Sequence, residues 1–173
     1  MDKFDGFRDF MVAHGGQLSR FAYLLTGNHH AAEDLMQSAL AKVAARWRKV
    51  AALDRPDAYV RRVMVNEHIS GWRRRQKLIE QPYEQLPEPP VADSSEETVR
   101  RILLERALGT LTAKQRAVIV LRFFHDMTEA ETAAELRCSI GNVKSQVHRA
   151  LAKLRGAAPE LAGLLRYGSE VPA

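Results

Sequence analysis

Polar and basic side chains gather on one face of a segment near the C-terminus of this 173-residue chain. At about 100° per residue, a helix beginning near Ser139 places five of them together: Asn142, Ser145, Gln146, Arg149 and Lys153. Lys144 and His148 lie beside this face, which contains no carboxylate. Arginine can bind the edge of guanine, while asparagine, glutamine and serine offer shorter hydrogen bonds. This chemistry predicts a surface that reads the major groove of double-stranded DNA.

The residues around this surface predict a helix-turn-helix from about Thr128 to Arg155. Thr128 with Glu131 forms a capping box, which predicts a short helix ending near Leu136. After a three-residue turn, Ser139 caps a second helix, which should bury one apolar face: Ile140, Val143, Val147, Ala150 and Leu154. The opposite face could be merely solvated, but the capped partner helix, the short turn and the absence of acids favour DNA reading.

Two small residues near this turn each have two interpretations. Gly141 weakens a helix by about 1 kcal/mol relative to alanine, so it indicates a close approach to the helix start by the DNA backbone or by the partner helix. Cys138 is the single cysteine and cannot form an internal disulfide. We expect it to pack in the core, and a redox role is the alternative.

A second basic site lies in a helix that should begin at Pro56, a favoured first-turn position, and continue to Arg75. One face of this helix carries Arg62, Asn66 and Arg73, and another carries Arg61 and Trp72; the helix closes on Arg73, Arg74 and Arg75. Arginines at a helix C-terminus are also favoured by the helix dipole alone. An aromatic ring among guanidinium groups, however, suits a site where bases stack while phosphates are neutralised.

The whole chain is predicted to be all-α, with two small helical domains joined by an acidic linker that contains prolines. Net charge is +5 for residues 1–75, −5 for residues 76–97 and +5 for residues 98–173. The acidic segment holds four of the seven prolines, so it neither packs nor continues a helix. We therefore expect domains at 1–75 and 98–156, a linker at 76–97 and a tail at 157–173.

Further helices are expected in both domains. The first should run from about Phe4 to Thr26 and stop at Gly27, and the next should begin near Asn28. Its buried face is predicted from residues at three- and four-residue steps: Ala32, Met36, Ala39, Val43 and Trp47. The apolar run 118–121 could be a strand by periodicity, but the capping box of Thr112 and Gln115 before it favours a helix.

Several classes of protein are excluded by composition and motif. No stretch approaches the roughly 20 apolar residues of a membrane span, so we expect a cytoplasmic protein with no membrane or small-molecule partner. The candidates for an enzyme site are the pairs 29–30 and 67–68, His-His and Glu-His, which match no metal or nucleophile motif. We expect no catalytic residue, no metal and no cofactor.

Three stretches, in order, resemble one protein family. They are 31–37 (AAEDLMQ), 59–66 (YVRRVMVN) and 139–145 (SIGNVKS) with Arg149-Ala150-Leu151 after it. Together they are similar to sigma-70-type RNA polymerase sigma factors, especially the extracytoplasmic function (ECF) group of the short actinobacterial kind. The resemblance extends from about Phe4 to Arg155.

The resemblance implies a transcription initiation factor that binds core RNA polymerase and promoter DNA. The second helix would dock on the largest polymerase subunits through Asp34, Gln37 and Leu40. The third helix and the loop before it would recognise and melt the −10 element, with these residues: Val50 in the loop, Arg61, Arg62, Asn66, Trp72, Arg73 and Arg74. The −35 element would be read by Arg122, Asn142, Lys144, Ser145, Gln146, His148 and Arg149. The family also admits an anti-sigma factor as a further partner.

The alternative is a stand-alone helix-turn-helix regulator, which would need a dimerisation surface or an effector pocket. Leu161, Leu164 and Leu165 could form a short dimer seam, although capping of the last domain is the other use. The expected linker of 22 residues reaches at most ~68 Å when extended, comparable to two helical turns of DNA. Two domains could therefore read sites that far apart.

Overall fold

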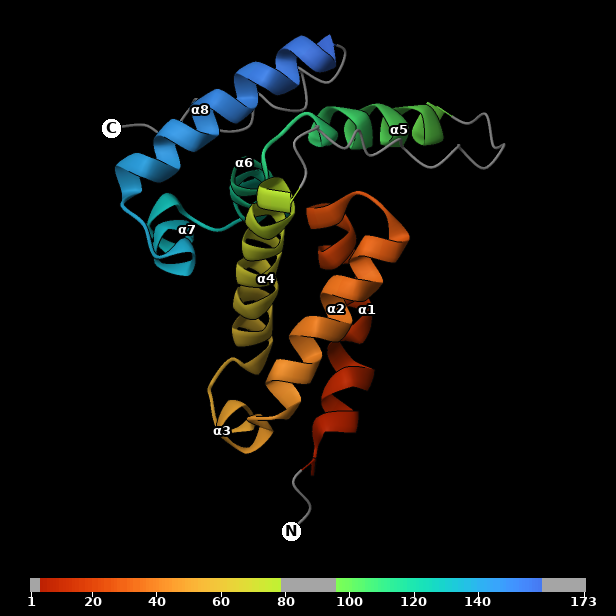
Figure 1. Cartoon of the computed structure of the whole chain (residues 1–173), viewed down its shortest axis with the longest axis vertical. Coiled ribbons are helices and arrows are strands. Elements are labelled where there is room, and N and C mark those ends of the chain that lie inside the picture. Colours follow the sequence, from red (N-terminus) through yellow and green to blue (C-terminus); the bar gives the residue numbers. More distant parts are fainter. Residues whose placement is uncertain (1–3, 79–95, 160–173) are drawn as a thin grey trace. The chain divides into compact units, whose positions relative to one another are not determined.

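The computed structural model describes residues 4–78 and 96–159, and helices are the regular secondary structure in that part of the chain. The chain divides into two compact units, residues 1–83 and 84–173. Along the first run α1 (Phe7–Thr26), α2 (His29–Ala44), α3 (Trp47–Ala51) and α4 (Pro56–Leu78) (Figure 1). Along the second run α5 (Glu96–Gly109), α6 (Ala113–Ile119), the π-helical η1 (Val120–Phe124), α7 (Glu129–Leu136) and α8 (Ile140–Ala157). The all-α prediction is confirmed.

The boundary between α1 and α2 follows local chemistry. Gly27 ends α1 in the left-handed conformation, at φ 84°, and its amide donates to the carbonyl of Tyr23. Asn28 caps α2, because its side-chain oxygen accepts a hydrogen bond of 2.7 Å from the amide of Ala31. Helices α1, α2 and α4 pack against one another. The core between them is apolar: Leu18, Phe21, Leu25, Ala39, Val43, Val60 and Met64 are buried.

Helix α3 was not expected from the sequence. Helix α2 ends at Ala44, so Trp47 does not extend its buried face but opens α3. Its indole ring is buried, donates from Nε1 to the carbonyl of Asp5 at 2.6 Å, and contacts the rings of Phe7 and Phe10 at 5.0 and 5.1 Å. The start of α1 is thereby tied to the segment between α2 and α4.

The C-terminal unit has its own core. One cluster joins α5, α6 and α8: Ala107, Leu108, Leu111, Ile119, Ala150, Leu154 and Ala158. A second joins Val118, Ala133 and Val143, and Cys138 packs partly buried against it. The capping box of Thr112 and Gln115 is present, and the run 118–121 is helical as predicted.

The predicted linker is shorter at both ends than expected. Helix α4 continues to Leu78 and α5 begins at Glu96, so residues 76–78 and 96–97 are helical. The remainder of that segment lies outside the described residues, as do Leu161, Leu164 and Leu165.

Candidate nucleic-acid interface

Helices α7 and α8 form the predicted helix-turn-helix, and four local hydrogen bonds hold its helix starts and its turn. Thr128 Oγ1 accepts a hydrogen bond from the amide of Glu131 at 3.1 Å, and the Glu131 carboxylate accepts one from the amide of Thr128 at 2.7 Å. Arg137 adopts the left-handed conformation, at φ 51°, and the Cys138 amide donates to the carbonyl of Ala133 at 3.0 Å. Ser139 Oγ then caps α8 by accepting from the amide of Asn142 at 3.1 Å. The turn between the two helices is therefore fixed by hydrogen bonds.

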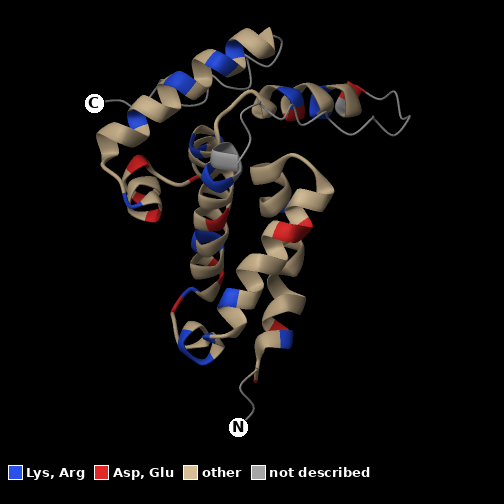
Figure 2. Ribbon diagram, viewed as in Figure 1, with Lys and Arg blue, Asp and Glu red and all other residues tan. Residues whose placement is uncertain are grey.

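The outward face of α8 carries the polar residues that the sequence predicted. Lys144, Ser145, His148, Arg149 and Lys153 are exposed, while Asn142 and Gln146 are half-buried. Figure 2 shows basic residues along α8 and no acidic ones. The side-chain oxygen of Asn142 is covered by protein and has no hydrogen-bond partner among the described residues. Of the uncharged polar residues here, Ser145 is therefore more open to a base than Asn142.

The inward face of α8 differs from the prediction at one residue. Val143, Ala150 and Leu154 are buried and Val147 is half-buried, but Ile140 is 46% exposed. Ile140 is the first residue after the Ser139 cap, where side chains project beyond the packed body of the helix. The expectation that Ile140 lies in the core is therefore wrong.

Two basic residues near this face contact the chain itself. Lys144 Nζ lies 3.7 Å from the carboxylate of Glu129, so an acid from α7 stands beside a face that has none of its own. Arg122 was expected to reach DNA, but its Nη1 donates to the carbonyl of Met127 and its guanidinium lies 6.0 Å from the centre of the Phe123 ring. In the chain without DNA, Arg122 therefore positions the loop before α7, and its contact with the −35 element stays a prediction.

Helix α4 presents part of its predicted basic surface. Asn66, Arg73 and Arg74 are exposed, and Arg62 and Trp72 are half-buried. Arg61 is engaged: its Nη1 lies 2.8 Å from Asp57 Oδ2, and its side chain is only 15% exposed. Burial would raise the pKa of Asp57, but the hydrogen bond and charge of Arg61, together with the backbone amide of Ala58 and the charge of Arg55, hold that pKa below its ordinary value. In the chain without DNA, Arg61 is thus already paired with Asp57.

The segment before α4 differs most from expectation. Val50 was predicted to lie in a loop and contact the −10 element, but it belongs to α3 and is 2% exposed. Its side chain packs in the core, so we do not retain it as a DNA contact. The basic residues that this segment exposes are Arg46, Arg48, Lys49 and Arg55, and it also exposes the acid Asp54. Figure 2 shows basic residues around α3. The sequence prediction missed them, although the run Arg-Trp-Arg-Lys at 46–49 was a signal of basic character.

The polymerase-docking residues expected on α2 are only partly open. Asp34 and Gln37 are exposed and one turn apart, while Leu40 is half-buried. Ala41, one turn after Gln37, is also exposed. Helix α2 thus presents a polar face on the side away from its buried residues.

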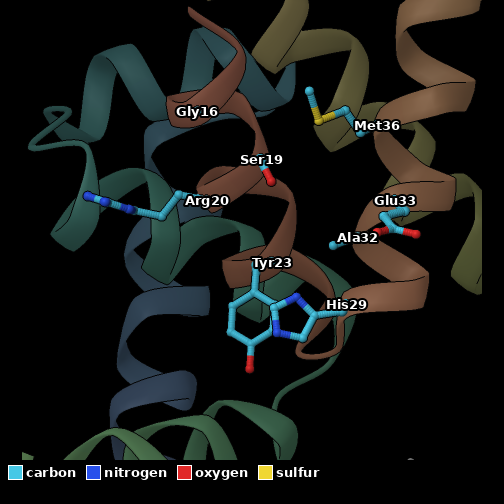
Figure 3. A pocket seen from close by; sticks show the side chains of 8 residues that line it. All are labelled: Gly16, Ser19, Arg20, Tyr23, His29, Ala32, Glu33 and Met36. Carbon is cyan, nitrogen blue, oxygen red and sulfur yellow. The ribbon is translucent and has the colours of Figure 1, made fainter.

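A pocket of about 310 Å³ lies between α1 and α2 (Figure 3). Its lining comes from both helices: Gly16, Ser19, Arg20, Tyr23, His29, Ala32, Glu33 and Met36. The His29 ring stacks on Tyr23, with centroids 4.8 Å apart. None of the predicted DNA contacts lines it.

The described residues contain no group of three or more histidine, cysteine, aspartate or glutamate side chains able to hold a metal ion. Within those residues, no helix is both long and apolar enough to cross a membrane.

Comparison with known proteins agrees with this geometry. The family model for Sigma-70 region 2 matches residues 10–78, and that for Sigma-70, region 4 matches residues 101–154. The RNA polymerase sigma-E factor of Streptomyces coelicolor is 45% identical over 149 residues, which are 86% of this chain and 84% of that protein. The ECF RNA polymerase sigma factor SigM of Mycobacterium tuberculosis is 31% identical over 161 residues, covering 91% of this chain and 78% of SigM.

Among solved structures, the sigma factor RpoE in complex with the anti-sigma factor NepR, from Bartonella quintana, has a similar fold. It aligns with a TM-score of 0.66 at 26% identity and covers 87% of this chain and 95% of that one. The two matched regions fall in the two compact units, and the second contains the helix-turn-helix. The chain therefore belongs to the sigma-70 family and is an RNA polymerase sigma factor of the ECF group.

Proposed function

We propose that this sigma factor reads promoters with two helices, each in its own domain. Helix α8 binds the −35 element in the major groove, and α4 with the basic segment around α3 recognises and melts the −10 element. Helix α2 docks on core polymerase through Asp34 and Gln37, with Leu40 at the edge of that face. The observation that carries the proposal is the exposed, acid-free face of α8 within a capped helix-turn-helix. The protein acts by binding and catalyses no reaction, in the cytoplasm where bacterial polymerase works.

Run-off transcription with purified core polymerase tests the proposal as a whole. We expect transcripts from a subset of genomic fragments only when both factor and core enzyme are present. Absence of core-dependent initiation at any fragment would refute it. Binding of a specific fragment by the factor alone, with no effect on core enzyme, would instead support the stand-alone regulator.

Arg149 tests the role of α8 in the −35 element. It is exposed on the face that also carries Ser145 and Lys153. If it makes a bidentate contact with a guanine, Arg149→Ala should weaken holoenzyme binding by about 1 to 3 kcal/mol and relax base preference at one position. An equal loss on every sequence would show that Arg149 touches phosphate only.

Asn66 tests the role of α4 in promoter melting. It is exposed on α4, one turn from Arg62 and two turns from Arg73. Asn66→Ala should slow promoter opening, followed by permanganate reactivity of the −10 thymines, more than it weakens the closed complex. Equal loss of both would count against a melting role.

We also propose an anti-sigma factor as a regulatory partner, because the related RpoE was crystallised with one. Affinity purification of the tagged factor from its own cells should then recover a protein that blocks run-off transcription. Recovery of core polymerase subunits alone would argue against such regulation.

A further inference from the structure

Helix α4 carries two carboxylates, and one of them lies next to a surface that must approach DNA if the proposed function holds. They are Asp57 and Glu67, and Glu67 directly follows Asn66 in the chain. Successive residues on a helix are separated by about 100°, so a free glutamate side chain at 67 could swing toward the surface that Asn66 occupies. A unit negative charge there would repel the phosphates of a bound strand.

The structure holds Glu67 away from that surface by two contacts to α2. Ser38 Oγ donates to Glu67 Oε2 at 3.0 Å, and Lys42 Nζ donates to Glu67 Oε1. The Glu67 side chain is 14% exposed, whereas the Lys42 side chain is 58% exposed. The carboxylate is therefore covered, and the ammonium group that covers it faces solvent.

The charge state of Glu67 makes this contact necessary. The hydrogen bond from Lys42 holds the pKa of Glu67 below its ordinary value despite partial burial, and Ser38 and the charge of Arg74 act in the same direction. Glu67 is therefore ionised at neutral pH. It cannot avoid repelling DNA by becoming protonated, so its charge has to be compensated by a partner.

We propose that Lys42 masks Glu67 and so keeps the surface of α4 positive toward −10 DNA. Lys42 is a positioning residue in this role, since it acts on DNA through the carboxylate it binds and not by touching a phosphate. An ion pair with one partner this exposed adds little to folding stability, so its main effect falls on the charge that DNA meets. The proposal rests on the proposed function, because it requires that α4 faces the −10 element.

Three variants test the mask: Lys42→Ala, Glu67→Gln and the double variant. Lys42→Ala frees the carboxylate and should reduce open-complex formation by about 3- to 10-fold, as expected for one added charge ~7 Å from a phosphate at an intermediate effective dielectric. Glu67→Gln keeps the shape and an acceptor for Ser38, so it should change opening by less than about 2-fold. The double variant should recover the activity of Glu67→Gln, because no charge remains to be masked.

The measurement uses holoenzyme on the most active promoter fragment from the run-off screen, at two salt concentrations. The defect of Lys42→Ala should shrink at higher salt, since screening weakens the repulsion. Arg101→Ala is the matched control: it removes a cation that lies 3.8 Å from Glu105 on α5 and should leave opening unchanged. An equal defect in Lys42→Ala and in the double variant would overturn the proposal, because Lys42 would then act by its own contact. Normal opening by Lys42→Ala would overturn it as well.

Two further measurements distinguish a failure of the proposed role of Lys42 from a failure of the proposed function. Affinity for core polymerase without DNA should be the same for all three variants, and a loss confined to that step would overturn the mask. By NMR titration, the pKa of Glu67 should rise in Lys42→Ala relative to the natural chain; no change would mean that the ion pair does not form in solution. Failure of the unmodified factor to initiate transcription would instead refute the proposed function itself.

Discussion

Gly141 gives the sharpest test of how α8 meets DNA, because one substitution should raise stability and lower function. Gly141 is the second residue of α8, and a Cβ added there meets nothing nearer than Ser139 Oγ at 4.0 Å. The partner helix therefore does not require a glycine at this position, which removes one of the two reasons that the sequence suggested. The DNA backbone remains the candidate.

The expected gain in stability follows from helix propensity. Alanine in place of an unstrained helical glycine stabilises by about 0.5 to 1 kcal/mol, partly by restricting the unfolded chain. For a domain of this size that is a rise of roughly 2 to 8 °C in the midpoint of thermal unfolding. Calorimetry or circular dichroism of the free factor measures this midpoint. A fall in the midpoint would contradict the finding that a Cβ at position 141 has free space around it.

The expected loss of DNA binding follows from the geometry of the helix start. Ser139 caps the amide of Asn142, while the amides of Ile140 and Gly141 have no intrahelical acceptor and suit a phosphate. Because Cβ atoms tilt toward the helix N-terminus, a methyl group at 141 would stand in the way of that phosphate. Loss of one charge-assisted contact costs about 1.5 to 3 kcal/mol, which holoenzyme binding to a −35 fragment would detect.

Gly156→Ala is the matched control for this prediction. Gly156 is also exposed, also helical and also free of neighbours within 4 Å of an added Cβ, but it lies about 22 Å further along α8. It should give a similar gain in stability with unchanged DNA binding. If Gly141→Ala behaves like Gly156→Ala in both measurements, the helix start does not approach the DNA backbone.

Three other predictions concern stability. Trp47→Phe should lower the free energy of unfolding by about 1 kcal/mol, the usual worth of the hydrogen bond to the Asp5 carbonyl, in urea unfolding followed by circular dichroism; no loss would refute that anchor. Thr128→Ala should cost about 1 kcal/mol through loss of the cap and speed hydrogen exchange of the α7 amides, whereas faster exchange in α2 would contradict a local effect. Asp57 has a lowered pKa in the folded chain, so its contribution to stability is complete above the unfolded pKa and is lost as pH falls through the folded one. The urea midpoint should therefore decline less below about pH 5 in Asp57→Asn than in the natural chain, and identical profiles would refute a contribution from the pair with Arg61.

The sequence predicted the helix starts well because capping is local chemistry. Asn28, Thr112, Thr128 and Ser139 each accept a hydrogen bond from an amide three residues later. A cap of this kind depends on residues within one turn and needs no knowledge of the fold. The outward face of α8 was equally predictable, because eighteen helical residues define the two sides of a helix by periodicity alone.

Prediction failed where the outcome depends on distant partners or on too few residues. Helix α3 has five residues, too few to show a period, so the sequence assigned the buried Trp47 to the preceding helix and placed Val50 in a loop. Arg122 donates to the carbonyl of Met127, five residues away; the sequence does not reveal this contact because it depends on how the loop before α7 folds, and the role of Arg122 at the −35 element stays a prediction. Periodicity identifies the face of a residue but not the partner it finds there.

The two proposed DNA-binding helices meet the same electrostatic requirement in different ways, which explains why one was easier to predict. Helix α8 contains no acid between Ile140 and Ala157, so its positive face can be inferred from the sequence alone. Helix α4 contains Asp57 and Glu67, and their charges are compensated by Arg61 in the same helix and by Lys42 in another. The net field that α4 presents is therefore a property of the folded N-terminal domain. Substitutions on α2 should for this reason alter the surface that α4 presents, whereas on α8 the one basic residue with a described acidic neighbour from another helix is Lys144, beside Glu129 of α7.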